Sequence, residues 1–210
     1  MSEQQTLSLQ QALDFAVQHH NEGRLSQAED IYQRILQTDP NQPVALHLLG
    51  VIFCHAGKYD TAVDLITKAL AIKPDLAEAH YNLGIVLQAL VKLEDAVASY
   101  RKALDLKPDY PDAHNNLGSV LKGLGKLEEA VTSYQNALAL KPDYAEAHNN
   151  LGAALQELGK LEEALTQHRR AISLDPQNNL FWNSFAACIE TASFTSVDDN
   201  LYQDLLHLLE

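Results

Sequence analysis

The sequence predicts an all-α protein built from tandem helix pairs, and three observations support this prediction. A segment of eight residues that starts at Ala77 recurs with few changes at Pro111 and again at Ala145, an interval of 34 residues each time. Prolines mark the same interval, at Pro40, Pro74, Pro108, Pro142 and Pro176. Between these prolines, apolar residues follow the three- and four-residue spacing of amphipathic helices. A fixed period of this kind indicates a repeat architecture, in which stacked units share one continuous core.

The period divides the chain into a leader, five repeat units and a C-terminal segment. Residues 1–8 form the leader and residues 9–178 form the repeats. The five units are 9–42, 43–76, 77–110, 111–144 and 145–178. Each unit is expected to hold two helices, which in the last unit run from about Glu146 to Leu158 and from about Leu161 to Leu174.

Glycine and proline define the ends of these helices. A glycine follows the first helix in four units, where the backbone needs a positive φ: Gly23, Gly57, Gly125 and Gly159. Val91 holds this place in the remaining unit, so its turn is expected to be built differently. Small residues recur on both helices and let the two backbones approach closely: Gly50, Gly84, Gly118 and Gly152 on the first, Ala62, Ala96, Ala130 and Ala164 on the second.

This pattern resembles the tetratricopeptide repeat. Leu-Gly at positions 7 and 8 of the unit, Ala at 20, an aromatic residue at 24, Ala at 27 and Pro at 32 support the resemblance across residues 9–178. The first unit departs most, because Phe15-Ala16 replaces Leu-Gly and Ile35 replaces the Ala at position 27. The resemblance implies a right-handed α-α superhelix, a solenoid whose first helices line a concave groove that binds a protein or peptide.

The C-terminal segment, 179–210, leaves the pattern after one more helix. Residues from Leu180 to Ile189 look like the first helix of a sixth unit, and a last helix is expected from about Asp198 to Leu209. One interpretation is a set of capping helices that shield the last apolar face. The other is a junction to a further domain that is not in this chain, since the aromatic residues around Trp182 resemble the junction in bacterial repeat-containing glycosyltransferases and methyltransferases.

The composition limits the classes of partner and the cellular location that we expect for this protein. The chain has 15 Lys and Arg against 28 Asp and Glu, a net charge of −13, which disfavours nucleic acid and anionic membrane surfaces. Its apolar runs are too short for a membrane span, and its start lacks the features of a secretory signal. Cys54 and Cys188 are far apart and form no metal or redox motif. We therefore expect a soluble, cytoplasmic protein with no membrane or nucleic-acid partner.

No catalytic constellation stands out, so the chain is not expected to be an enzyme or to hold a cofactor. The glycines from Gly118 to Gly125 are explained by the repeat and lack the spacing of a phosphate-binding loop. His80, His114 and His148 recur in register, but equivalent positions in stacked helices lie roughly 10 Å apart. These histidines are therefore expected to pack between helices, in the place of the family's Trp, and no metal site is predicted.

The groove supplies the candidate binding residues. Position 6 of the unit carries Asn in three successive repeats, and a carboxamide can both donate to and accept from the backbone of an extended peptide. The arrangement resembles the asparagine ladder in the repeat domains of O-linked N-acetylglucosamine transferases. The candidate peptide-binding residues are Asn82, Asn116, Asn150, Asn115, Asn149, Tyr81, His47, Gln88, Lys122 and Gln156. The alternative is that these amides are solvated or bonded between repeats.

Three functions fit this pattern. The first is a scaffold that holds an extended segment of a protein or peptide in its groove through the Asn row. The second is the substrate-recruiting arm of a larger transferase whose catalytic domain is not in this chain. The third is a module that self-associates through its terminal repeats. The negative charge favours a neutral or basic partner.

Overall fold

The computed structural model describes residues 8–193, which form eleven α-helices and, within that range, no strand. The all-α fold of tandem helix pairs predicted from the sequence is confirmed. The predicted leader up to residue 7 and the predicted last helix lie outside the described residues. The chain divides after Pro108 into two compact units, here called unit 1 and unit 2.

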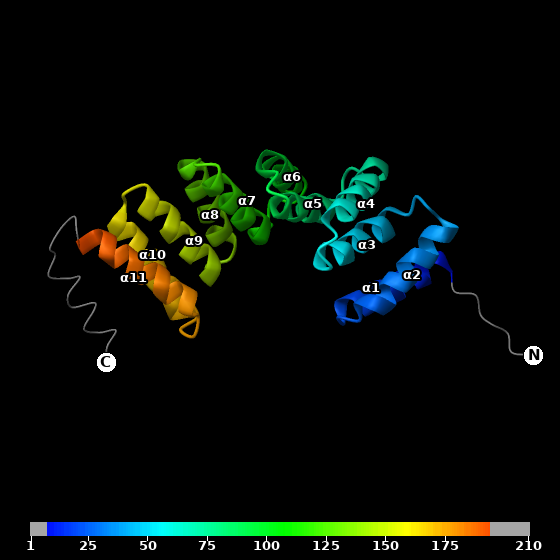
Figure 1. The fold of residues 1–210 in the computed structure, drawn as a ribbon, viewed down its shortest axis with the longest axis horizontal. Coiled ribbons are helices and arrows are strands. Elements are labelled where there is room, and N and C mark those ends of the chain that lie inside the picture. Colours follow the sequence, from blue (N-terminus) through cyan, green and yellow to red (C-terminus); the bar gives the residue numbers. More distant parts are fainter. Residues whose placement is uncertain (1–7, 194–210) are drawn as a thin grey trace, which may run out of the picture. The chain divides into compact units, whose positions relative to one another are not determined.

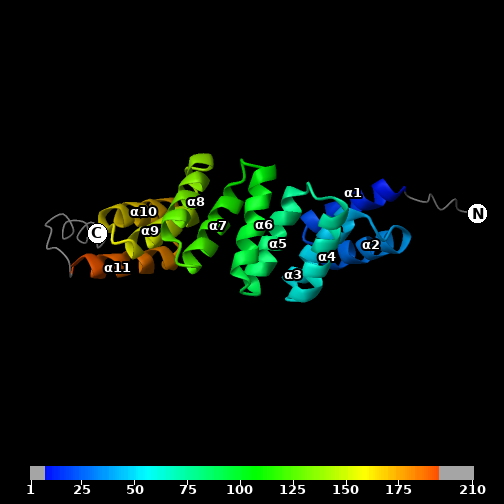
Figure 2. The same ribbon diagram turned by 90° about the horizontal axis from the view of Figure 1, so that it is seen from above.

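Unit 1 contains three helix pairs in chain order (Figure 1). Their helices are α1 (Leu9–Asn21), α2 (Leu25–Thr38), α3 (Pro43–His55), α4 (Tyr59–Ile72), α5 (Ala77–Ala89) and α6 (Leu93–Leu106). Besides the contact inside each pair, the second helix of one pair packs against the first helix of the next, as α2 does on α3 and α4 on α5. The view from above in Figure 2 shows α3, α4, α5 and α6 following one another in this way.

Unit 2 continues the same scheme with two pairs and one further helix. Its helices are α7 (Pro111–Gly123), α8 (Leu127–Leu140), α9 (Ala145–Glu157), α10 (Leu161–Leu174) and α11 (Asn179–Ser193). The helix α11 begins 34 residues after α9 and packs on α10, in the place of a sixth first helix. First helices also touch each other, α7 with α9 and α9 with α11, so their side chains form one wall of the unit.

The two helices of a pair cross where a glycine faces a large ring. A Cβ added to Gly84 would lie 2.6 Å from the ring of Tyr100, and one added to Gly118 would lie 2.7 Å from the ring of Tyr134. Both tyrosines are fully buried. The small residue that the sequence placed at this position is therefore required by the ring that occupies its space.

In three places, the residue at position 4 of the repeat bonds to the proline that closes the preceding unit. The Nε2 atoms of His80 and His148 lie 2.9 Å and 3.0 Å from the carbonyl oxygens of Pro74 and Pro142. Trp182 donates its indole N–H to the carbonyl of Pro176 in the same way, over 2.9 Å. Because a carbonyl oxygen only accepts, Nε2 of each histidine donates and thereby reproduces the donor of the tryptophan.

The turn at Val91 differs from its prediction. Val91 has φ = 59°, in the left-handed region that Gly23, Gly57, Gly125 and Gly159 occupy in the other turns. Its backbone N–H donates to Gln88 O over 3.0 Å, matching the bond of 2.9 Å from Gly125 N–H to Lys122 O. The expectation of a different turn is wrong, because the packing of the helix pair imposes the same backbone path whatever residue is present.

Candidate functional site

In unit 1, Asn82 on α5 is held by a buried histidine on α3. Asn82 Nδ2 lies 2.8 Å from His47 Nε2, and because the amide nitrogen only donates, the imidazole accepts. Burial lowers the pKa of His47 to about 4, so the ring is neutral near pH 7 and able to accept this bond. The contact fixes the orientation of the Asn82 carboxamide between α3 and α5.

Asn82 also lines a small pocket of about 50 Å³. Its walls are mainly aliphatic, from Val51, Ile66, Ile85 and Val86, and Cys54 and His55 complete the lining. Two further candidates lie on the same helix: the side chain of Gln88 accepts a hydrogen bond of 3.0 Å from Tyr100, and Tyr81 has its ring centroid 5.9 Å from that of Tyr100.

In unit 2, Asn150 on α9 is held in the same manner by Asn115 on α7. Asn150 Nδ2 donates to Asn115 Oδ1 over 3.1 Å, and Asn115 is buried. Asn115 in turn donates a long bond of 3.5 Å to Asn116 Oδ1. Asn116 and Asn150 are half-buried, so both remain accessible on the wall.

Asn149 is turned into the helix pair. Its Oδ1 atom accepts a hydrogen bond of 3.2 Å from Nδ1 of His168 on α10, and both residues are buried. Desolvation lowers the pKa of His168 to about 4, and its Nε2 atom is buried without a partner. His168 is therefore a neutral ring inside the protein, in the place that Tyr134 takes in the preceding pair.

The other two candidates make contacts with the next first helix. Lys122 forms an ion pair of 3.0 Å with Glu157, and Gln156 donates to the Thr191 hydroxyl over 3.0 Å. Lys122 and Gln156 are half-buried.

The structure thus joins the candidates in pairs that are 35 residues apart. His47 with Asn82 and Asn115 with Asn150 link position 5 of one repeat to position 6 of the next. Both positions are predicted for the groove from the sequence, but their pairing was not predicted. The repeat period contained the signal, since adding one residue to 34 connects both pairs. The binding role of the ten residues stays a prediction.

Residues 8–193 carry no group of three or more His, Cys, Asp or Glu side chains placed to hold a metal ion. None of the helices in this part of the chain has the length and apolar character needed to cross a membrane.

Comparison with sequence families gives matches along most of the helical region. The family described as TPR repeat matches residues 92–125 and 119–159, and the one described as tetratricopeptide repeat matches residues 145–178. Residues 21–103 match the family described as anaphase-promoting complex, cyclosome, subunit 3. No curated protein sequence matches the chain significantly.

Solved structures with the same fold include three that cover most of the chain. The crystal structure of MamA is 25% identical and covers 77% of this chain and 95% of its own, with a TM-score of 0.70. A thermophilic TPR protein of Thermus thermophilus, TTC0263, is 26% identical over 87% of this chain and 99% of its own, with a TM-score of 0.65. YrrB, described as a TPR protein with an unusual peptide-binding site, is 24% identical over 84% of this chain and 91% of its own, with a TM-score of 0.72.

Scaffolds of this kind typically bind proteins or peptides and are typically non-catalytic. The periodic helix pairs, the buried glycine–ring contacts and the family matches lead to one conclusion. The chain belongs to the tetratricopeptide-repeat proteins.

Proposed function

We propose that this chain binds an extended segment of a protein partner, and that Asn82, Asn116 and Asn150 contact the backbone of that segment. The observation that supports the proposal is the fixed orientation of two of these amides: Asn82 is held by His47 and Asn150 by Asn115. A side chain that is already oriented loses less conformational entropy when it binds a ligand.

The remaining bonding capacity of these amides suits a peptide backbone. Each Nδ2 uses one of its two hydrogens inside the protein, at 2.8 Å for Asn82 and 3.1 Å for Asn150. The second hydrogen of each amide can donate to a peptide carbonyl, and Oδ1 can accept from a peptide N–H. Backbone contacts of this kind tolerate many sequences.

The pocket beside Asn82 adds a place for one side chain of the partner. Its walls from Val51, Ile66, Ile85 and Val86 are aliphatic, and its volume of about 50 Å³ suits a short branched side chain. A valine or isoleucine of the partner would bury apolar surface there while its backbone meets Asn82.

The test starts from short linear peptides selected from a phage-displayed library against the full chain. The affinity of a selected peptide is then measured by fluorescence anisotropy for the unchanged chain and for Asn82→Ala, Asn116→Ala and Asn150→Ala. We expect each substitution to weaken binding roughly five- to tenfold, the effect of losing about 1 kcal/mol of hydrogen bonding.

Matched controls use asparagines that lie elsewhere and are exposed, Asn41 between α2 and α3 and Asn136 on α8. Asn41→Ala and Asn136→Ala should leave the affinity unchanged. If the three groove substitutions bind the peptide as tightly as these controls, with unchanged helical circular dichroism, the Asn row has no binding role and the proposal fails.

A further inference from the structure

The outward face of the first helix pair is apolar and hollowed. A pocket of about 390 Å³ lies on α1 and α2, lined by Leu9, Ala12, Phe15, Ile31 and Ile35, with Arg34 and Thr38 as its polar groups. Contiguous apolar side chains around a surface hollow ordinarily mark an interaction site. The occupant of this hollow therefore needs an explanation.

Two substitutions in the repeat pattern create this surface. Phe15 stands where the other repeats have Leu, and Ile35 stands where they have Ala, so the first repeat departs from the family at two residues that line the pocket. Position 7 is nearly buried in other pairs, with Leu49 4% and Leu151 3% exposed, whereas Phe15 is 46% exposed. Phe15 and Ile35 therefore make the surface of the first described helix pair bulkier and more apolar than Leu and Ala would.

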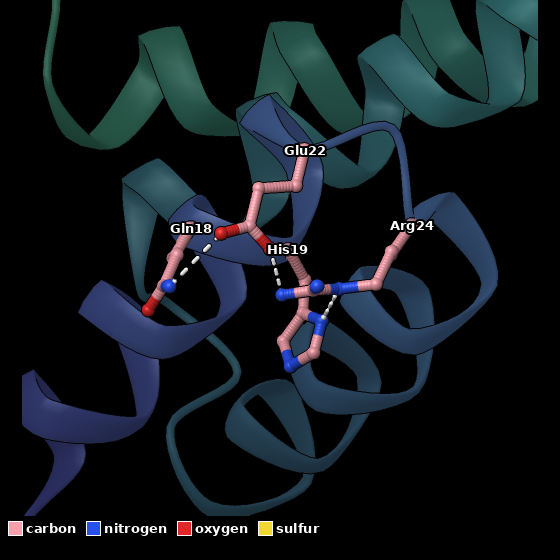
Figure 3. A network of polar contacts seen from close by, with 4 residues as sticks. All are labelled: Gln18, His19, Glu22 and Arg24. Atoms are coloured by element: carbon pink, nitrogen blue, oxygen red, sulfur yellow. Dashed lines mark hydrogen bonds and ion pairs between the residues drawn. The ribbon is translucent and has the colours of Figure 1, made fainter.

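The ring of Phe15 is fixed in place by a polar network at the end of α1. It packs edge-on against His19, with the ring centroids 4.4 Å apart and the planes at 85°. Figure 3 shows Arg24 beside His19 and Glu22; Arg24 Nε donates to His19 Nδ1 over 2.7 Å and the guanidinium forms an ion pair with Glu22. Gln18 donates to Glu22 over 3.0 Å and completes the network. Contacts between neighbouring side chains thus hold Phe15, which lines the hollow, in a fixed orientation.

The later repeats indicate what covers this face. The position equivalent to Phe15 in the third repeat is Leu83, which packs in one cluster with Ile66 of α4. In the same cluster, Val63 and Leu70 of α4 supply further aliphatic contacts. At that point of the array, the covering element is an amphipathic helix with aliphatic residues three and four positions apart.

We propose that the α1–α2 face is a docking site for an amphipathic helix of a partner protein. The apolar stripe of that helix fills the hollow between Phe15, Ile31 and Ile35, and a carboxylate on its flank meets Arg34 at the rim. This site is separate from the Asn row and does not depend on the proposed peptide function.

The probe is a peptide with the sequence of α4, Tyr59–Ile72, acetylated and amidated. Asp64 and Lys68, both exposed in the protein and four residues apart, are joined as a lactam to hold the peptide helical, and Asp60 remains as the carboxylate. Its binding to the full chain is followed by methyl NMR signals of Ile31 and Ile35. The control peptide carries Ile66→Ser and Leu70→Ser.

We expect saturable shifts at Ile31 and Ile35 with the helical peptide and none with the control peptide. Phe15→Glu should weaken binding at least tenfold, because it places a charge in the apolar hollow. Leu180→Glu, at a residue that is 62% exposed on α11, should leave binding unchanged. Phe15→Ser serves in place of Phe15→Glu if the latter loses helical circular dichroism.

Several results would overturn the proposal. One is the absence of shifts at this face, and another is equal affinity for the two peptides. A third is sedimentation of the free chain as a dimer that Phe15→Glu dissociates, which would assign the face to a second copy. A fourth is a change in the signals of residues 1–7 on Phe15→Glu without peptide, which would assign it to the leader.

Discussion

Val91 has a backbone conformation that suits glycine. Its φ of 59° is sparsely populated by residues with a Cβ and least by β-branched ones, and its side chain is 75% exposed, so packing gives little in return. The four equivalent turns have glycine at this place. The helix-pair geometry therefore imposes strain at this one residue.

Val91→Gly should raise the free energy of unfolding by about 1 kcal/mol, because the left-handed strain is relieved. Urea unfolding followed by circular dichroism measures the change. Val91→Ala keeps a Cβ and therefore should gain clearly less. Equal stability of the glycine variant and the unchanged chain would show that the turn carries no strain.

His168 makes unit 2 sensitive to acid. Its ring is fully buried, and desolvation lowers its pKa from 6.5 to about 4. Between these two pH values the unfolded chain binds a proton at residue 168 that the folded chain does not. The free energy of unfolding is therefore highest above pH 6.5. It decreases as the pH falls toward 4, by up to about 3 kcal/mol.

His168→Phe should reduce the slope of the unfolding free energy against pH between 7.5 and 5, because an aromatic ring is kept and the titration at residue 168 is removed. The slope that remains includes the contribution of the buried His47. The stability of His168→Phe at pH 7.5 falls somewhat, since Asn149 loses its donor, so the slope is the diagnostic quantity. Thr166, an exposed residue on the same helix that does not titrate, gives the control, and Thr166→Ala should keep the original slope. An unchanged slope in His168→Phe would contradict the assignment.

At the scale of elements, each pair of helices depends on a close crossing. In the pair α7 and α8, a Cβ at Gly118 would lie 2.7 Å from the ring of Tyr134, which is fully buried and donates to Ser119 over 3.2 Å. A Cβ at this distance would force the buried ring or the helix backbone to shift. The glycine is therefore kept despite its poor helix propensity.

Gly118→Ala should lower the free energy of unfolding by roughly 1–3 kcal/mol, the usual effect of overpacking a core. Gly123→Ala is the matched control, because it makes the same change on the same helix at an exposed residue. That control should gain up to about 1 kcal/mol from helix propensity. Thermal unfolding measures the stability of both variants. If Gly118→Ala were as stable as Gly123→Ala, the close crossing at Gly118 would be refuted.

At the scale of the whole molecule, the net charge of −13 affects how fast charged ligands associate with the protein. Such a field attracts cationic ligands over about 10 Å at 0.1 M salt and less at higher salt. Lysines appended to a selected peptide should raise its association rate, and this gain should shrink several-fold from low to high salt in stopped-flow measurements. The same peptide with appended glutamates should associate more slowly. If the association rate of the cationic peptide did not depend on the salt concentration, electrostatic steering would be excluded.

The period of 34 residues and the spacing of apolar residues within it were enough to predict the helix pairs from the sequence. The expected helix from about Leu161 to Leu174 agrees with α10, and the expected first helix of that unit lies within one residue of α9 at each end. These features are local and repeated, so short-range patterns encode them. The crossing glycines were predicted for the same reason.

The features that could not be predicted from the sequence depend on the packing of neighbouring helices. The pairing of His47 with Asn82 and of Asn115 with Asn150, the burial of Asn149 against His168 and the left-handed Val91 all depend on which groups meet across helices. The apolar hollow around Phe15 depends equally on how α1 and α2 pack together. By itself the sequence determined where helices begin and end, because those ends follow from local patterns. Only the tertiary structure decided which side chains are satisfied inside the protein and which remain for a partner, because that depends on contacts between separate helices.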